Sequence, residues 1–326
     1  MTQTPILDVK ALRVEFPGRH GTVTALADVS FSIQPGEILG VVGESGAGKS
    51  MAGLAVQGLL EPPGRVSGGE VRLDGRRIDT LTDGEMEKVR GKEIGAIFQD
   101  PLTSLNPLFS VGQQLVETIR LHLGLDRKTA RARAIALLTE VGIPAPDVRV
   151  DHYPHQFSGG MRQRVVIALA LAARPKLIIA DEPTTALDVS IQAQITALLR
   201  KLCDDHGTAV MLVTHDMGVI AETADRVAVM YAGRLVEVGP VAEVIANPQH
   251  PYTAGLMGSI PALGARVPML TQIDGSMPRL DAIPAGCAFN PRCPKVMDRC
   301  RVERPELMPS GSGQSACWLK AMETTP

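Results

Sequence analysis

One short stretch, Gly43–Ser50, restricts the fold of this chain more than any other. It reads GESGAGKS and matches the pattern G-x-x-x-x-G-K-[ST], in which glycines let successive backbone N–H groups face one anion. The apolar run Ile38–Val42 before it is typical of a buried strand. Met51–Val56 after it is typical of a helix, whose N-terminal dipole end favours negative charge. The stretch therefore predicts a phosphate-binding loop between a strand and a helix.

The residues of this loop have different expected roles. Lys49 is expected to reach the β- and γ-phosphates of a nucleotide, and the Ser50 hydroxyl to ligate Mg²⁺. The complete set that we predict to contact ATP here is Gly43, Glu44, Ser45, Gly46, Ala47, Gly48, Lys49, Ser50 and Met51.

Bulk properties narrow the class of protein. A length of 326 residues suits one large domain with an appendage, and aromatic residues are only 3%, so an aliphatic core is expected. The net charge of −2 offers no basic surface for nucleic acid, and we expect no nucleic-acid partner. No signal peptide and no apolar run of about 20 residues is visible, which predicts a soluble chain in the cytosol.

Polar side chains follow three further apolar runs that are typical of buried strands. Gln99 follows Ile94–Phe98, the pair Asp181 and Glu182 ends the run from Leu177, and His215 follows Ala209–Val213. In an open α/β sheet, ligands bind at the edge where parallel strands end. We expect Asp181 and Gln99 to serve Mg²⁺, Glu182 to act as general base, and His215 to contact the γ-phosphate. Taken singly, Gln99 and His215 are more typical of ordinary loop residues.

Two other stretches bear on nucleotide binding. Ser158, Gly159, Gly160 and Met161 open an apolar helix, where a hydroxyl and bare N–H groups indicate either a helix cap or a second phosphate site. Phe16, near the end of an early strand, is a candidate to stack on adenine, with a core aromatic as the equal alternative.

These motifs, in this order and spacing, resemble the ATP-binding subunit of ABC transporters from about Leu7 to Gly255. The resemblance implies a P-loop NTPase of α/β class, with an antiparallel β subdomain and a helical insertion at about residues 102–173, all within residues 1–260. It implies that Ser158–Met161 and Asp188 contact the nucleotide of a second subunit, and that Gln99 links to the membrane subunits. It also gives the roles above to Phe16, Glu182 and His215. Phe157 and Met161 stand where many members have Leu and Gln, and both differences are mild.

The branch of the family is narrowed by four local stretches. Phe98–Pro107, Tyr153–Gln156 and His250–Thr253 look like the dipeptide and oligopeptide importer branch, which includes nickel importers, and Asn290–Pro294 fits that branch too. This implies two transmembrane permease subunits, a second ATPase subunit that is a different chain, and an extracytoplasmic peptide-binding protein that acts indirectly. The subunit would lie at the cytoplasmic face of the membrane as a peripheral protein.

Alternatives to a peptide importer remain open. A nickel or other small-solute importer uses the same branch, and a soluble ABC-type ATPase is less consistent with a single cassette that has no long coiled-coil insertion. A P-loop kinase leaves the Ser158–Gly160 stretch and His215 unexplained. A degenerate regulatory subunit conflicts with the presence of Lys49 and Glu182.

The last segment, residues 261–326, is predicted to be a separate cysteine-rich extension. It has few apolar residues but carries four of the five cysteines, Cys287, Cys293, Cys300 and Cys317, in the spacing C-x5-C-x6-C-x16-C. A segment with so little apolar material suggests folding around a metal. The spacing resembles the C-terminal motif of peptide-importer ATPases, which implies a [4Fe-4S] cluster held by these thiolates, with Zn²⁺ as the alternative.

Overall fold

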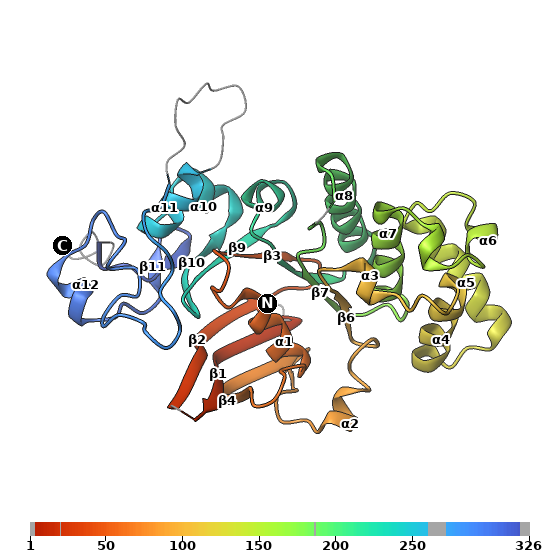
Figure 1. Cartoon of the computed structure of the whole chain (residues 1–326), viewed down its shortest axis with the longest axis horizontal. Helices are drawn as coiled ribbons and strands as arrows, with labels where there is room; N and C mark the ends of the chain where they lie inside the picture. Colours follow the sequence, from red (N-terminus) through yellow and green to blue (C-terminus); the bar gives the residue numbers. More distant parts are fainter. Residues whose placement is uncertain (1–3, 20, 186, 260–271, 320–326) are drawn as a thin grey trace. The chain divides into compact units, whose positions relative to one another are not determined.

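The structure is a computed structural model that describes residues 4–19, 21–185, 187–259 and 272–319 (Figure 1). The chain divides into two compact units. Unit 1 comprises Met1–Leu7, Ile33–Ile38 and Thr80–Val213, and unit 2 comprises Asp8–Ser32, Leu39–Asp79 and Thr214–Pro326. The boundary that the sequence predicts at residue 261 falls among residues 260–271, outside the described part, and stays a prediction.

Unit 1 combines three parallel strands with helices. The strands are β6 (Ile94–Ile97), β7 (Leu177–Asp181) and β8 (Ala209–Val213), in the order β8-β7-β6. The registers align Ile97 with Ala180 and Asp181 with Val213, so the carboxyl ends of these strands lie at one edge. Its helices are α2 (Asp83–Met86), α3 (Pro101–Ser104), α4 (Val111–Leu123), α5 (Arg127–Glu140), α6 (Pro146–Arg149), the 3-10 helix Pro154–Gln156, α7 (Gly159–Ala170) and α8 (Val189–His206).

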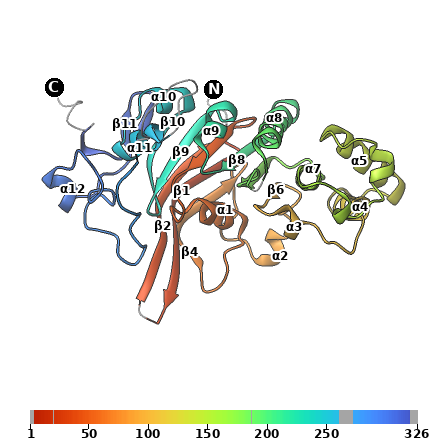
Figure 2. The ribbon, with the colours of Figure 1, turned by 45° about the horizontal axis from the view of Figure 1, so that its top comes forward.

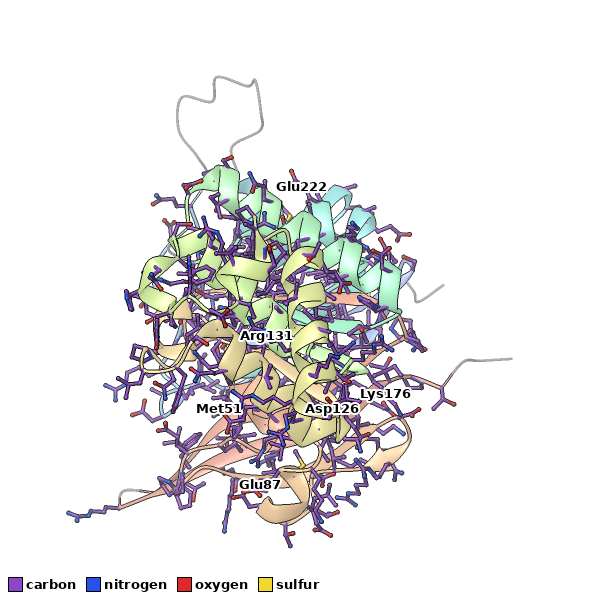
Figure 3. All side chains as sticks on the ribbon, turned by 90° about the vertical axis from the view of Figure 1, so that its right-hand side faces the viewer. Met51, Glu87, Asp126, Arg131, Lys176 and Glu222 are labelled. Carbon is purple, nitrogen blue, oxygen red and sulfur yellow. The ribbon has the colours of Figure 1, made fainter. Side chains whose placement is uncertain are left out.

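Helices α3 to α7 occupy the stretch where the sequence predicts a helical insertion, and α4, α5, α6 and α7 gather together in Figure 1. Sequence signals set their ends. Ser110 and Gln113 form a capping box at the start of α4, and Asp126 caps α5 through the N–H groups of Lys128 and Thr129. Figure 3 labels Asp126, the residue before this helix, and Arg131, which lies on it. The basic first turn of α5 is balanced by this acidic cap.

Unit 2 contains two sheets. The first has the order β2-β1-β4-β5, and β1 and β2 form its long strands (Figure 2). Its strands are β1 (Leu7–Gly18), β2 (Gly21–Ile33), β4 (Arg65–Leu73) and β5 (Arg76–Arg77). The β4–β5 hairpin turns at Asp74-Gly75.

The second sheet of unit 2 carries the phosphate loop. Its order is β11-β12-β10-β9-β3, where β3 (Ile38–Val42) is buried throughout and pairs in parallel with β9. The remaining strands are β9 (Arg226–Tyr231), β10 (Arg234–Pro240), β11 (Met308–Ser310) and β12 (Gly313–Ser315). The helices of unit 2 are α1 (Lys49–Gln57), α9 (Met217–Thr223), α10 (Val241–Ala246), α11 (Pro251–Gly258) and α12 (Asp298–Val302).

The described part of the C-terminal segment is built onto this sheet. Strand β12 pairs antiparallel with β10, with Glu237 opposite Ser315, and the Ala316 N–H donates to the Val236 carbonyl at 2.8 Å. Phe289 lies in edge-on contact with Tyr231 and Tyr252, at ring-centroid distances of 5.3 and 5.4 Å. The segment therefore obtains its apolar packing from strands and helices that precede it in the sequence.

Candidate functional site

The phosphate loop joins β3 to α1, and two of its glycines are required by their backbone geometry. Gly43 has φ +152°, and a Cβ there would stand 2.3 Å from the Met230 carbonyl oxygen. Gly48 has φ +104°, and a Cβ there would stand 2.7 Å from Leu26 Cδ2. Any other residue would be strained in conformation and would overlap a neighbour. The loop can thus keep its curl only with glycine at these two positions.

Lys49 is buried at the start of α1, and its Nζ donates to the Gly43 and Glu44 carbonyls at 2.8 and 3.1 Å. Ala47 N–H donates to the Glu44 carbonyl, and Gly233 N–H donates to the Ala47 carbonyl. These hydrogen bonds fix the carbonyl oxygens of Gly43, Glu44 and Ala47 in place. Ser45, Gly46 and Ser50 are exposed, and Met51 is half-buried on α1 (Figure 3). A rigid curled backbone with an ammonium at its base is suited to bind a polyphosphate.

The two predicted carboxylates lie in unit 1 at the end of β7. Asp181 is the last residue of the strand, and Glu182 follows with φ +47°. A left-handed conformation is unusual for glutamate, and strain of this kind clusters at active sites. It is held by a hydrogen bond from Glu182 N–H to the Val213 carbonyl at 2.8 Å.

Gln99 and Glu182, 83 residues apart in the sequence, are in direct contact. Gln99 Nε2 donates to Glu182 Oε2 at 3.1 Å, and Thr185 Oγ1 donates to the same oxygen at 2.8 Å. Gln99 follows β6 and Glu182 follows β7, so the pairing of these strands brings the two residues together. The structure thus joins two predicted site residues of unit 1 at one edge of its parallel strands.

Ser158 and Asp188 both cap helices of unit 1. Ser158 Oγ accepts from Met161 N–H at 3.4 Å at the start of α7, and Asp188 Oδ1 accepts from Ile191 N–H at 2.9 Å at the start of α8. Both side chains are exposed, as is Gly159. A cap role is therefore established within this chain, and the predicted contact with a second subunit's nucleotide stays a prediction.

Phe16 and His215 both belong to unit 2. Phe16 is half-buried at the end of β1, and a Cβ at Gly64 would stand 2.5 Å from its ring, so the ring lies against the Gly64 backbone. His215 is exposed, one residue before Asp216, which caps α9. Their predicted contacts, with adenine and with the γ-phosphate, stay predictions.

The predicted metal centre in the C-terminal segment is wrong. Cys287, Cys293, Cys300 and Cys317 line one narrow pocket. Within residues 4–259 and 272–319, apart from the gaps stated above, no three His, Cys, Asp or Glu side chains form a group that would hold a metal ion. Burial raises the pKa of the Cys287 thiol to about 11 and also raises that of Cys293, which favours thiols over thiolates. The iron–sulfur prediction is therefore overturned, and Zn²⁺ has no support.

The physical reason lies in the premise of that prediction. The sequence suggested that a segment so poor in apolar residues must fold around a metal. In the structure Phe289 packs against Tyr231, Tyr252 and His250, and β12 extends an existing sheet. The segment packs its apolar side chains against the rest of unit 2. The composition of the segment alone therefore does not indicate whether it needs a metal to fold.

Sequence reasoning missed three residues that border the phosphate loop. Tyr252 Oη accepts from Glu44 N–H at 2.9 Å, Arg292 forms an ion pair with the Glu44 carboxylate, and Met277 Sδ accepts from Ala232 N–H at 3.4 Å. The stretches that carry Tyr252 and Arg292 were visible as branch-specific motifs. Their spatial partner was not visible, because it lies more than 200 positions away in the chain.

Among the residues that the structure describes, none of the helices has both the length and the apolar character needed to cross a bilayer.

Comparison with known proteins gives consistent matches. Residues 26–185 match the family described as ABC transporter, and residues 236–300 match the family described as oligopeptide/dipeptide transporter, C-terminal region. The oligopeptide transport ATP-binding protein OppD of Haemophilus influenzae is 47% identical, over 97% of this chain and 98% of that protein. The dipeptide transport ATP-binding protein DppD of Escherichia coli is 46% identical, over 96% of each chain.

Solved structures agree on the fold. A dimeric structure of the ATP-binding cassette MJ0796, in a post-hydrolysis state bound to ADP and Pi, has a TM-score of 0.65 at 30% identity, over 72% of this chain and 98% of that one. CbiO1 of Clostridium perfringens, part of an ABC transporter complex, also has a TM-score of 0.65 at 30% identity, over 75% of this chain and 92% of that one. These matches confirm the predicted ABC-type P-loop ATPase fold. The chain belongs to the ABC transporter ATP-binding proteins, in the family of oligopeptide and dipeptide transport subunits.

Proposed function

We propose that this chain hydrolyses ATP to drive uptake of dipeptides and oligopeptides across the cytoplasmic membrane. One observation carries the proposal: near full-length similarity to peptide-transport ATP-binding proteins coincides with a phosphate loop whose glycines Gly43 and Gly48 are geometrically required. The match of residues 236–300 to the oligopeptide/dipeptide C-terminal region favours peptides over other solutes.

The phosphate loop supplies binding in this proposal. Lys49 and backbone N–H groups of the loop would hold the β- and γ-phosphates of ATP. The Ser50 hydroxyl, Asp181 and Gln99 offer the oxygen donors that Mg²⁺ prefers. When bound, Mg²⁺ would neutralise phosphate charge. The proposal that these residues hold Mg²⁺ is supported by the exposed Ser50 hydroxyl at the start of α1 and by the position of Asp181 at a strand end.

Glu182 supplies the proton chemistry. Its carboxylate is oriented by Gln99 and Thr185, and its backbone is fixed in a left-handed conformation. A carboxylate held in this way can accept a proton from the water that attacks the γ-phosphate. The released proton leaves with the solvent after phosphate departs, and His215 would contact the γ-phosphate before that step.

Partners follow from the family. The exposed Ser158 and Asp188 would meet the nucleotide of a second ATPase subunit, which we propose to be a different chain. Two transmembrane permease subunits would hold the pair at the cytoplasmic face of the membrane, and an extracytoplasmic peptide-binding protein would act indirectly. The relatives are named only as ATP-binding proteins of peptide transport, so this composition is our proposal.

Reconstitution tests the function. The chain would be purified with its membrane partners, placed in vesicles, and supplied with ATP and either a labelled tripeptide or labelled Ni²⁺. We expect peptide uptake that is lost in Lys49→Ala vesicles. Uptake of Ni²⁺ without peptide would replace peptide by nickel as substrate, and co-purification with ribosomes in place of membrane proteins would refute an importer.

A further inference from the structure

The C-terminal segment holds the phosphate loop through an ion pair. Arg292 Nη1 lies 3.1 Å from both carboxylate oxygens of Glu44, the second residue of the loop. The Arg292 side chain is only 7% exposed and that of Glu44 is 29% exposed. An ion pair withdrawn from water in this way is screened far less than one on the surface. Removing either partner would leave the other charge uncompensated.

Arg292 is fixed independently of Glu44. Its Nε donates to the Asp274 carbonyl at 2.8 Å, and its Nη1 lies 3.3 Å from the Tyr231 hydroxyl. Its guanidinium stands 5.9 Å from the ring centroids of Tyr231 and Phe289, within cation–π distance. The arginine is therefore held in place before it pairs with Glu44, so little side-chain entropy is lost in the pairing.

A second contact fixes the backbone of the same loop residue. Tyr252 is fully buried on α11, and its hydroxyl accepts from Glu44 N–H at 2.9 Å. The start of α11 is held by Glu237, whose carboxylate accepts from the N–H groups of Gln249 and His250 at 2.7 and 2.8 Å. Strand β10 is thus connected through α11 to the phosphate loop.

A third contact borders the loop at Gly46. A Cβ at Gly46 would stand 3.6 Å from the Met277 methyl carbon. The Met277 sulfur also accepts from Ala232 N–H in the β9–β10 turn. Three residues outside the nucleotide-binding motif therefore surround Glu44 and Gly46, and two of them, Met277 and Arg292, come from the C-terminal segment.

We propose that Arg292 is a positioning residue for ATP binding, through which the C-terminal segment sets the affinity of the phosphate loop. The Glu44 carboxylate belongs to the loop that binds a polyphosphate, and like charges in a partly buried site repel strongly. Arg292 neutralises Glu44 and holds it in one orientation, so that the ammonium of Lys49 and the N–H groups of the loop dominate the local field. The inference rests on the nucleotide site proposed above and assigns to the segment a role in that site.

The experiment measures ADP and non-hydrolysable ATP-analogue binding by calorimetry on the purified full-length chain. Arg292→Gln is expected to weaken binding roughly 5- to 30-fold, in the range of couplings between linked sites. The loss should be larger for the triphosphate than for ADP and smaller at high salt, because salt screens charge repulsion. Arg279→Gln is the matched control, since Arg279 is an 83% exposed arginine of the same segment that pairs with Asp281.

Two further variants distinguish the loss of charge neutralisation at Glu44 from a general loosening of the phosphate loop. Glu44→Gln combined with Arg292→Gln removes both charges and is expected to restore affinity to near the wild-type value. Glu44→Gln alone, which removes the negative charge and leaves Arg292 in place, should bind the triphosphate more tightly than the wild type. This single variant still tests the proposal if Arg292→Gln does not fold. Trp318, the one tryptophan of the chain, lies in the segment and reports its folding by fluorescence.

The outcomes decide whether Arg292 sets nucleotide affinity through its charge or only stabilises the fold. Recovery in the double variant, with a salt-dependent loss in Arg292→Gln, supports the proposal. Unchanged affinity in Arg292→Gln, or unchanged or weaker binding in Glu44→Gln alone, overturns it. If the phosphate loop does not bind nucleotide at all, Lys49→Ala would bind nucleotide as well as the wild type does. This result distinguishes failure of the proposed function from failure of the Arg292 proposal.

Discussion

Gln99 Nε2 donates a hydrogen bond to Glu182 Oε2 at 3.1 Å, joining the residues that follow two paired strands, β6 and β7. Thr185 Oγ1 donates to the same carboxylate oxygen. A carboxylate fixed by two donors keeps one orientation, which a general base needs because proton transfer requires hydrogen-bond reach. Gln99, which is predicted to serve Mg²⁺, and Glu182, which is predicted to accept a proton, are therefore linked by a hydrogen bond.

The first prediction concerns Glu182. Glu182→Gln keeps the shape of the side chain and removes its basicity, so nucleotide should still bind while hydrolysis in the assembled transporter slows by roughly two to four decades. The measurement is phosphate release, with nucleotide binding determined in parallel. Glu222→Gln is the control, because Glu222 is an exposed glutamate of α9 (Figure 3) and should have no effect. Hydrolysis at the wild-type rate in Glu182→Gln would exclude Glu182 as the base.

The second prediction concerns Gly48. Gly48→Ala places a Cβ at φ +104° and 2.7 Å from Leu26 Cδ2, so the backbone is strained and either the Leu26 side chain or the loop must shift. We expect nucleotide affinity to fall roughly ten- to a hundredfold, the worth of one or two hydrogen bonds to a charged group. Gly124→Ala is the control. Gly124 ends α4 at φ +66° in open space, and its replacement should cost about 1 kcal/mol of stability with no change in affinity. Equal affinities in the two variants would refute the required curl at Gly48.

The motifs predicted local structure well because their signals are local. The phosphate loop between a strand and a helix, and the helix start at Ser158, each depend on neighbours within a few residues. The sequence also predicted which side chains follow strand ends, and strand pairing then brought Gln99 to Glu182.

Long-range structure escaped the same reasoning. Nothing near Arg292 indicates that it pairs with Glu44, because an ion pair over 248 positions has no local signal. Strand β12 is three residues long and adds to β10 as an edge strand, which leaves no periodicity to detect. The metal prediction failed for the same reason: it judged the C-terminal segment alone, whereas Phe289 packs on Tyr231 and Tyr252.

The third prediction separates the two roles of Ser158. Aspartate caps helices as well as serine does, so Ser158→Asp should retain the stability of α7. Its added negative charge would repel a nucleotide phosphate, and ATP hydrolysis by the assembled pair of ATPase subunits should fall at least about tenfold. Thermal unfolding and hydrolysis are measured on the same preparation. Asp126→Ala, which removes the cap of α5, is the converse control and should lower stability alone. Full hydrolysis in Ser158→Asp would show that Ser158 is a cap and nothing more.

The last prediction concerns His250 and acid. His250 is fully buried, its Nδ1 accepts from Tyr252 N–H at 3.0 Å, and burial lowers its pKa from 6.5 to about 3. The unfolded chain therefore binds more protons than the folded chain between those two values, so the free energy of unfolding decreases as the pH falls below 6.5. From pH 7 to pH 5 the decrease from this residue is about 2 kcal/mol, because the loss sets in below pH 6.5 and each pH unit below that value is worth about 1.4 kcal/mol.

Replacement by asparagine tests this directly. In His250→Asn the amide oxygen can accept the same hydrogen bond from Tyr252 N–H without titrating. We expect the unfolding free energy of this variant to depend on pH less steeply than that of the wild type between pH 7 and pH 5. His155→Asn, at an exposed histidine of the helical region, is the control and should leave the slope unchanged. Since Tyr252 binds the Glu44 N–H, acid that destabilises the start of α11 should also weaken nucleotide binding in the wild type more than in His250→Asn. Parallel pH profiles for the two proteins would contradict both expectations.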